Sequence, residues 1–339
     1  MDKHTAAFIM PVKLSGNEQE LRHFRESVAS IENQTDDNWI LIMVDDYSHD
    51  NDVYDAIDSI KERLKSKVHV IYSHQNYGAG TSRNRGIRYA NEIGAPFILF
   101  NDSDDLSDPN RLRLVREVFE QDDTVNVVYT SFDVIDENGN ITPLEQVNPT
   151  VREIIEGHQS DIVEGEYAWI GIATKKKYTN LTSCTAVRTS LAVQEPFPNV
   201  SVSEDCHTWL RYAAHPGKFV FLRDIKGGYR ICSGVASRSR SANDDFYGKM
   251  FEMDASGFEE ALKLAQKYDT MGGLDENDLR AAFFVRLALC LFHSGEETYC
   301  KKALKIAADI SESQTLRLIE LLQCEEQEKE QLKVLASEK

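Results

Sequence analysis

The sequence predicts an α/β fold in which a mostly parallel sheet is flanked by helices and followed by an all-helical segment. Two observations support this expectation. Over the first hundred residues, short apolar runs alternate with stretches of helical spacing. After Asn243 the strand pattern disappears and helical spacing continues to the end. A chain of 339 residues also exceeds one average domain, so we expect a large domain followed by an accessory segment.

The first expected strand covers residues 7–10 and ends at Pro11, because proline has no N–H for the strand ladder. Further strands are expected at residues 39–44, 68–72 and 97–100, and helices at residues 18–34, 52–64 and 82–92. Residues 39–44 are apolar throughout, which is typical of a strand buried on both faces. Helices of this length between strands favour parallel pairing.

The pattern changes after residue 125. We expect a strand at residues 127–129 and a turn at residues 137–140. Residues 145–177 read as a loop-rich insertion with one short helix. Helices are expected at residues 258–268, 279–292, 300–310 and 316–335. The predicted division is therefore a domain at residues 1–243 and a helical region at residues 244–339.

Composition limits the function. The net charge of -18 disfavours nonspecific binding to nucleic acid or anionic lipid. The six cysteines form no CxxC pair, so reduced thiols are expected rather than a zinc site. No stretch approaches the roughly 20 apolar residues of a membrane span. We therefore expect a cytoplasmic protein. Peripheral association with a membrane and assembly into a homo-oligomer are both compatible with this expectation.

Acidic residues follow two of the predicted strands. Asp45 and Asp46 come after the second strand, and Asp102, Asp104 and Asp105 come after the fourth. Ligands of open α/β sheets bind beyond the carboxyl ends of the strands. Neighbouring acidic clusters repel each other unless a cation or hydrogen-bond donors lie between them, and a divalent cation that binds carboxylate and diphosphate fits this need. The alternative is that these residues only cap helices and form turns.

A glycine-containing segment lies between the two clusters. Gly78 and Gly80 precede a helix that carries Arg83 on its first turn. Glycine lets backbone approach a ligand closely, and the arginine can reach a phosphate or a base. Alone the motif is weak, because glycine also marks ordinary turns.

Taken in order, the motifs resemble those of a family 2 glycosyltransferase with the GT-A fold, over about residues 5–240. The matching segments are residues 8–12, 30–35, 44–50, 76–86, 100–112 and 203–211. Under this resemblance, residues 1–125 form the nucleotide-sugar half of the catalytic domain and residues 126–243 the acceptor half.

The resemblance also implies roles for individual residues. The implied nucleotide-binding residues are Pro11, Val12, Asp45, Asp46, Gly80, Arg83 and Asp102. Asp104, together with Asp102, would bind Mg²⁺ or Mn²⁺. Asp205 would be the general base, with Glu204 beside it in the catalytic site.

The implied activity is inverting transfer of a sugar from a nucleotide diphosphate, with UDP the favoured nucleotide, to a hydroxyl of a carbohydrate or another acceptor. A sugar hydroxyl is a poor nucleophile, so a carboxylate has to accept its proton as the bond forms. The leaving diphosphate gains charge that a divalent cation neutralises.

Two other functions would use a similar sheet or a similar pocket. A nucleotidyltransferase would need a glycine-rich phosphate loop after the first strand, where only Lys13 and Gly16 occur. A non-catalytic module that binds a nucleotide sugar would not need the acidic pair Glu204 and Asp205.

The sequence departs from the family pattern in three places. Tyr47 stands where glycine is common, and Asn101 stands where an apolar residue is usual. No histidine near residues 229–233 offers a further metal ligand. Arg230, Arg238 or Arg240 could close over the diphosphate, or could be ordinary surface arginines.

Overall fold

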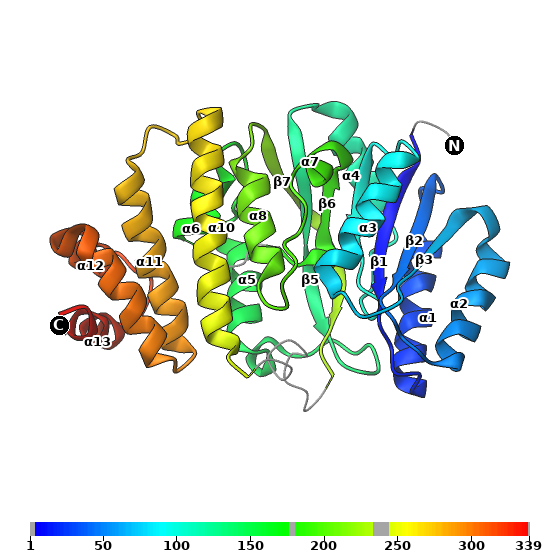
Figure 1. Cartoon of the computed structure of the whole chain (residues 1–339), viewed down its shortest axis with the longest axis horizontal. Coiled ribbons are helices and arrows are strands. Elements are labelled where there is room, and N and C mark those ends of the chain that lie inside the picture. Colours follow the sequence, from blue (N-terminus) through cyan, green and yellow to red (C-terminus); the bar gives the residue numbers. More distant parts are fainter. Residues whose placement is uncertain (1–3, 176–179, 233–243, 338–339) are drawn as a thin grey trace.

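The computed structural model describes residues 4–175, 180–232 and 244–337, and its centre is one mixed seven-stranded sheet (Figure 1). The strand order is β3-β2-β1-β4-β6-β5-β7. The strands are β1 (Ala6–Val12), β2 (Trp39–Asp45), β3 (Val68–Tyr72), β4 (Phe97–Phe100), β5 (Val125–Ile135), β6 (Thr185–Arg188) and β7 (Lys218–Arg230). The predicted α/β class is confirmed.

Strand β1 continues through Pro11 to Val12, so the expected end at Pro11 is wrong. The hydrogen bonds explain why proline is tolerated. Ile9 O accepts the N–H of Asn101 on the β4 side, and Val12 O accepts the N–H of Asp46 on the β2 side. Every second residue of a strand directs its backbone N–H and C=O to the same side, so the Pro11 nitrogen faces β4 as Ile9 does. Strand β4 ends at Phe100, opposite Ile9, so no ladder hydrogen bond is lost at Pro11.

The four strands β1 to β4 are parallel to one another, as predicted. Strand β6 lies antiparallel between β4 and β5, and β7 pairs parallel with β5. The sequence reading placed neither β6 nor β7. Strand β6 has only four residues, and Gly227 and Gly228 interrupt the apolar alternation of β7.

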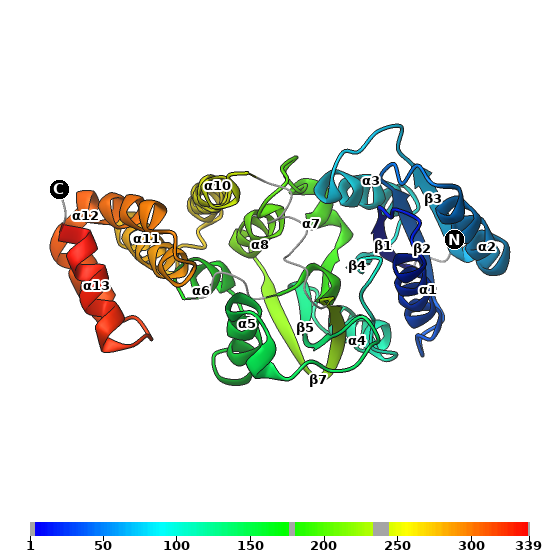
Figure 2. The same ribbon diagram turned by 90° about the horizontal axis from the view of Figure 1, so that it is seen from below.

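Helices cover both faces of the sheet, and each face carries its own apolar core. Figure 2 shows α1 (Glu18–Glu32) and α4 (Arg111–Gln121) on one face, and α3 (Ala79–Glu92), α7 (Thr189–Gln194) and α8 (Glu204–Ala214) on the other. Helix α2 (Asn51–Leu64) packs beside β3. Because consecutive strand residues face opposite sides, Phe8 belongs to one core and Ile9 to the other.

The segment expected to carry one short helix contains two, α5 (Pro149–Ser160) and α6 (Ala168–Thr174). Asn148 caps α5 by accepting the N–H of Val151, and proline is favourable at the first helical position. Three short 3₁₀ turns lie at Lys65–Lys67, Leu144–Gln146 and Thr182–Cys184.

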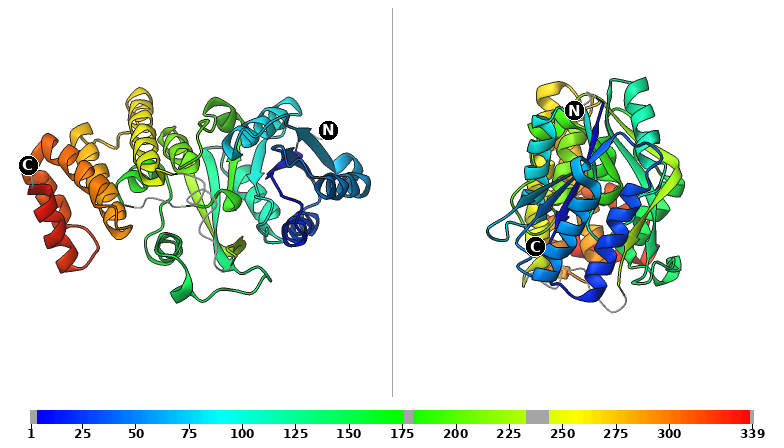
Figure 3. Two further views of the ribbon diagram at one scale, coloured as in Figure 1. Left: turned by 60° about the horizontal axis from the view of Figure 1, so that its bottom comes forward. Right: turned by 90° about the vertical axis from the view of Figure 1, so that its right-hand side faces the viewer.

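The C-terminal region is helical, as predicted, and forms the end of the molecule opposite β3 (Figures 1 and 3). Its helices are α10 (Phe246–Tyr268), α11 (Glu276–His293), α12 (Glu297–Glu320) and α13 (Glu326–Ser337). The backbone of α12 is non-helical at Ser311, close to the break expected between the third and fourth helices. In the part of the chain described here, no helix has both the length and the apolar character needed to cross a membrane.

The C-terminal helices share one core with the face of the sheet that α3, α7 and α8 cover. Phe258 of α10 stacks on Phe283 of α11, with ring centroids 4.3 Å apart, and both belong to the core that contains Ile9. Trp169 Nε1 donates to the carbonyl oxygen of Thr270 at 2.8 Å, and Thr270 Oγ1 donates to that of Ala214 at 2.6 Å. Side chains and backbone of both regions therefore pack as one body.

Candidate active site

A cavity of about 1270 Å³ lies at the carboxyl ends of β1 and β4. It brings together all but two of the residues for which the resemblance implied a nucleotide-binding, metal-binding or catalytic role. Those that line it are Pro11, Val12, Asp46, Arg83, Asp102, Asp104, Glu204 and Asp205. Asp45 and Gly80 do not line the cavity.

Asp45 and Asp46 both fix local backbone. The Asp46 carboxylate accepts the N–H of Tyr77 at 2.8 Å and that of Gly78 at 2.7 Å, and so holds the loop before α3 against the end of β2. Asp45 is fully buried and accepts the N–H of Ser48 at 3.2 Å. Only Asp46 therefore reaches the cavity wall.

The turn after Asp46 keeps the backbone conformation that glycine favours. Tyr47 has φ of 68° and His49 has φ of 56°, both in the left-handed region. For a residue with a side chain this conformation costs about 1–2 kcal/mol. The two rings stack with centroids 4.8 Å apart, which offsets part of that cost. Tyr47 therefore adopts a backbone conformation that glycine would adopt without this cost.

Gly80 permits helix α3 to lie against the chain before the acidic pair. A Cβ at this position would come within 2.9 Å of the Pro198 carbonyl oxygen. One turn later, the Asn84 amide exchanges two hydrogen bonds with the backbone of Phe197, at 2.8 and 2.9 Å. The sequence reading gave Asn84 no role, because an isolated asparagine on a helix carries no recognisable signal.

Arg83 joins the two carboxylate groups of the cavity. Its Nη2 donates to both oxygens of Asp102, at 2.9 and 3.2 Å, and its Nη1 donates to Glu204 Oε1 at 3.1 Å. The side chain is 4% exposed. Burial opposes its charge, but the carboxylates of Asp102 and Glu204 outweigh burial and raise the pKa of Arg83 above its ordinary value. It therefore lies as a fixed cation between Asp102 and Glu204.

The acidic segment after β4 is partly committed to structure. Asp105 is buried and accepts from Ser183 Oγ at 2.5 Å and from the N–H of Arg230 at 2.9 Å. Burial, followed by the charges of Asp104 and Asp102, raises the pKa of Asp105 well above its ordinary value. Asp102 and Asp104 line the cavity instead, so the charge of this segment is directed there.

The residues present fit a cation that arrives with a diphosphate. Among the described residues, no group of three or more histidine, cysteine or acidic side chains could hold a metal ion by itself. Mg²⁺ in proteins is commonly held by one or two carboxylates together with waters and substrate phosphates. Asp102 and Asp104 offer hard oxygen ligands of that kind beside one another on the cavity wall.

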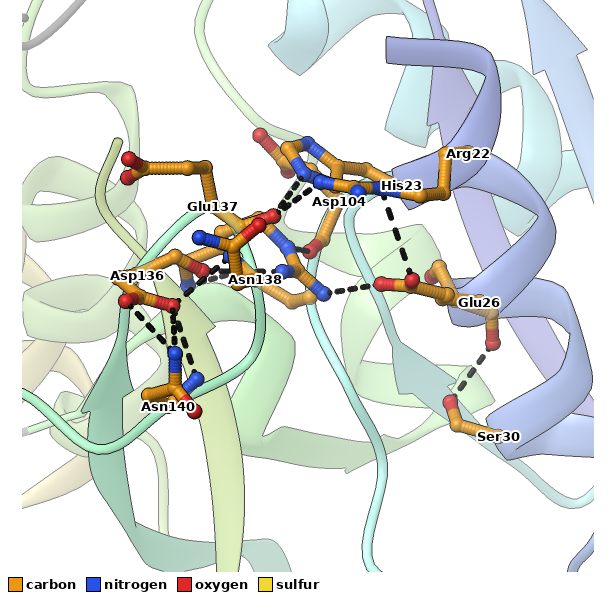
Figure 4. A network of polar contacts seen from close by, with 12 residues as sticks. Arg22, His23, Glu26, Ser30, Asp104, Asp136, Glu137, Asn138 and Asn140 are labelled. Atoms are coloured by element: carbon orange, nitrogen blue, oxygen red, sulfur yellow. Dashed lines mark hydrogen bonds and ion pairs between the residues drawn. The ribbon is translucent and has the colours of Figure 1, made fainter. Parts of the chain in front are cut away.

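Arg230 holds this segment in place through Glu26, Asp104 and Asp136, which Figure 4 labels, and this corrects the expectation that it closes over a diphosphate. Its Nε donates to the carbonyl oxygen of Asp104 at 2.9 Å, its Nη1 to that of Asp136 at 3.0 Å, and its Nη2 to Glu26 Oε2 at 2.8 Å. The residue is 6% exposed, and each of its three guanidinium nitrogens already donates to one of these partners. Arg238 and Arg240 lie outside the described residues.

The acidic pair begins helix α8 directly after a strained residue. Ser203 has φ of 58° in the left-handed region. Glu204 is ion-paired with Arg83, whereas Asp205 Oδ1 accepts the N–H of Cys206 at 2.8 Å. Burial, followed by the charge of Glu204, raises the pKa of Asp205 to about 7. A base is most effective when its pKa lies near the operating pH.

The C-terminal helices also reach the cavity, which the sequence reading did not specify residue by residue. Phe246, Tyr247 and Met250 of α10 line it, as do Cys290 of α11 and Ser294, which directly follows that helix. These residues follow the last matching motif, and apolar residues at helical spacing usually indicate core packing. The sequence pattern alone therefore did not indicate that these C-terminal residues line the cavity.

Comparison with known proteins decides the family. The sequence model of Glycosyl transferase family 2 matches residues 9–181, about half of the chain. The chain belongs to this family. It is therefore a glycosyltransferase, as the motifs predicted.

Among curated relatives of this glycosyltransferase is an uncharacterized glycosyltransferase of Methanocaldococcus jannaschii, 26% identical over 242 residues, which are 68% of this chain and 72% of the relative. Another is the Escherichia coli UDP-Glc:alpha-D-GlcNAc-diphosphoundecaprenol beta-1,3-glucosyltransferase WfgD, 28% identical over 41% of this chain and 49% of its own length. The chain thus spans only about half of this second relative.

Solved structures support the GT-A fold of this glycosyltransferase. Staphylococcus aureus TarS, residues 1–349, in complex with UDP-GlcNAc, aligns with a TM-score of 0.59 and 17% identity, over 94% of this chain and 84% of that one. The similarity extends over the C-terminal helices as well as the sheet.

Proposed function

We propose that this glycosyltransferase transfers a sugar from a UDP-linked donor to an acceptor hydroxyl, with inversion at the anomeric carbon. The observation that carries the proposal is that one cavity contains Arg83 between two acidic groups, Asp102 and Asp104 on one side and Glu204 and Asp205 on the other. A nucleotide sugar that spans the two groups would have its diphosphate near Asp102 and Asp104. Its anomeric carbon would then lie near Glu204 and Asp205.

The uridine nucleotide is supported by the relatives. WfgD is named for a UDP-Glc donor, and TarS has been solved with UDP-GlcNAc. In this chain, Pro11 and Val12 at the end of β1 and the loop held by Asp46 would border the base. Asp102 and Arg83 would lie next to the ribose and the sugar.

Asp102 and Asp104 would hold Mg²⁺ or Mn²⁺ together with the donor diphosphate. The bound cation would neutralise the charge that develops on the leaving UDP. Arg230 keeps the Asp104 backbone fixed, so this carboxylate would not need to reorganise when the donor binds.

Asp205 would accept the proton of the acceptor hydroxyl. Its raised pKa suits this task, because a carboxylate with an ordinary pKa near 4 is a much weaker base at neutral pH. Glu204 would keep Arg83 in position through their ion pair. We also propose a cytoplasmic location, which the reduced state of all six cysteines supports.

The test is to incubate the full chain with individual UDP-sugars, with Mg²⁺, Mn²⁺ or EDTA, and to measure UDP release. We expect slow hydrolysis of one UDP-sugar that depends on the cation and becomes faster when an acceptor is supplied. Thermal shift with UDP, GDP, CDP and dTDP under the same conditions tests the base, because a specific ligand raises the melting temperature by mass action. Preference for another nucleotide would contradict the UDP assignment, and full activity in EDTA would contradict the cation.

A further inference from the structure

We infer that the first two turns of α10 form the acceptor subsite, and that the Phe246–Tyr247 pair receives the ring of a neutral acceptor sugar. The inference rests on the proposed function and adds to it the part of the chain that binds the acceptor and the chemical class of that acceptor. It assigns a role in substrate binding to the C-terminal helical region.

The position of α10 relative to α8 is the first argument. Figures 1 and 2 both show the two helices side by side. At Gly257 a Cβ would lie 2.8 Å from the Cα of His207, so the helices are in close contact at this point. Further along both helices, Arg211 Nε of α8 lies 3.5 Å from Glu260 Oε2 of α10. The two helices therefore run parallel, and the buried Asp254, one turn before Gly257 on α10, lies level with the start of α8.

Helix geometry then places the start of α10 beyond the acidic pair. With a rise of 1.5 Å per residue, Met250 lies about 6 Å and Tyr247 about 10 Å further along the axis than Asp254. Helix α8 begins at Glu204, so α10 extends past its N-terminus at this point. Phe246, Tyr247 and Met250 line the same cavity as Glu204 and Asp205. They form the part of the cavity wall that lies beyond the N-terminus of α8.

The chemistry of this wall indicates the occupant. The rings of Phe246 and Tyr247 meet at 88° with centroids 5.1 Å apart, and Met250 adds an apolar side chain. A pyranose has apolar C–H faces that pack on aromatic rings, and hydroxyls that donate to carboxylates. Glu204 and Asp205 can accept such hydrogen bonds, but they repel an anionic group. The site therefore favours a neutral sugar.

Helix α12 holds this wall in place. Asp245 caps α10 by accepting the N–H of Gly248 at 3.1 Å, and it also accepts the hydroxyl of Tyr299, at 3.0 and 3.2 Å. A Cβ at Gly248 would meet both the Asp245 carboxylate and, at 2.4 Å, the Tyr299 hydroxyl oxygen, so glycine leaves room for this pair of side chains. The Asp245–Tyr299 contact thereby fixes the orientation of the first turn of α10.

Saturation-transfer NMR tests this proposal without requiring turnover. The full chain, with Mg²⁺ and UDP, is mixed in turn with methyl glycosides of glucose, galactose, mannose, N-acetylglucosamine and glucuronic acid. We expect transfer to at least one neutral glycoside and weaker transfer to the glucuronide. Tyr247→Ala should lower affinity about tenfold or more, as is usual when a central aromatic contact is removed. Tyr247→Phe should retain it, because the ring is kept.

Met253→Ala is the matched control, since Met253 is on the same helix and is not among the residues that line the cavity. It should bind the glycoside as the parent does. Tyr299→Phe leaves the cavity wall chemically intact and removes only the hydroxyl that holds Asp245, so it should weaken binding even if Tyr247→Ala fails to fold.

Equal saturation transfer in the parent, Tyr247→Ala and Tyr299→Phe would overturn the proposal. Absence of transfer to every neutral glycoside in the parent would overturn it as well. Failure of the donor proposal would be seen separately, as absence of UDP binding and UDP-sugar hydrolysis in the parent, and it would not alter the comparison between these variants.

Discussion

Among single residues, the ionisation of Asp205 determines how the reaction should depend on pH. Its pKa is raised to about 7, so below that pH the carboxyl is protonated and cannot act as a base. We expect kcat/KM to rise about tenfold per pH unit up to about pH 7 and then to level off. A pH–rate profile with saturating cation measures this. A rate that is constant from pH 5 to pH 8 would exclude Asp205 as the base.

Substitution should distinguish the role of Asp205 from that of Glu204. Asp205→Asn should lower kcat on the order of 10²–10⁴-fold, the usual loss for a positioned base, and should leave donor affinity nearly intact. Glu204→Gln can still accept a hydrogen bond from Arg83, so its effect should be at least about tenfold smaller, or roughly 1.4 kcal/mol. Steady-state kinetics and UDP titration of both variants test this order. If Glu204→Gln is the more damaging change with donor affinity preserved, the two roles are reversed.

Asp104 is predicted to be the residue through which the cation acts. Asp104→Asn should abolish turnover and make UDP binding insensitive to Mn²⁺, because an amide oxygen is a much weaker ligand than a carboxylate. Calorimetric titration of UDP with and without Mn²⁺ measures the effect. Asp123→Asn, at a fully exposed position, is the control and should behave like the parent. Metal-dependent activity in Asp104→Asn would contradict the assignment.

At the level of elements, the contact between α8 and α10 depends on Gly257. Alanine normally stabilises a helix interior by about 1 kcal/mol relative to glycine. Here the added Cβ would meet the His207 backbone at 2.8 Å, so Gly257→Ala should instead destabilise the protein, by about 1–3 kcal/mol. Because His207 follows Asp205 by two residues, kcat should fall too.

Urea denaturation of Gly257→Ala gives the sign of the change. Ser256→Ala, at the preceding position of the same helix, is the control and should be neutral or slightly stabilising. A stabilised Gly257→Ala protein would mean that α10 and α8 are not in close contact.

Elements whose own residues determine their structure could be predicted from the sequence. Elements that form only through pairing or packing with distant segments could not. Strands β3 and β4 begin and end at the predicted residues, because an apolar run between helical stretches is a local property. Strand β6 was missed because four residues acquire strand geometry only through pairing with β4 and β5. The acidic residues were recognised from ordered motifs. The wall at Tyr247 was not, because its place in the cavity arises only from the packing of α10 on α8.

For the molecule as a whole, the C-terminal helices should be indispensable. A chain ending near Asp244 would expose core side chains such as Trp169, whose ring now lies against Phe258 of α10, and would remove the wall at Tyr247. We expect it to aggregate or to lose acceptor-stimulated turnover. Soluble yield and UDP release measure these two outcomes. A truncated protein that matches the full chain in both would show that the helical region is dispensable.

The core that runs from Ile9 in β1 to Leu332 in α13 has a consequence for how the protein melts. Sequence motifs divide the chain near residue 243, but no break in apolar packing coincides with that division. Heat should therefore be absorbed in one calorimetric peak whose van't Hoff enthalpy matches the measured enthalpy. In such a cooperative unit, a ligand held at the nucleotide end raises the unfolding temperature of α11 and α13 as much as that of β1.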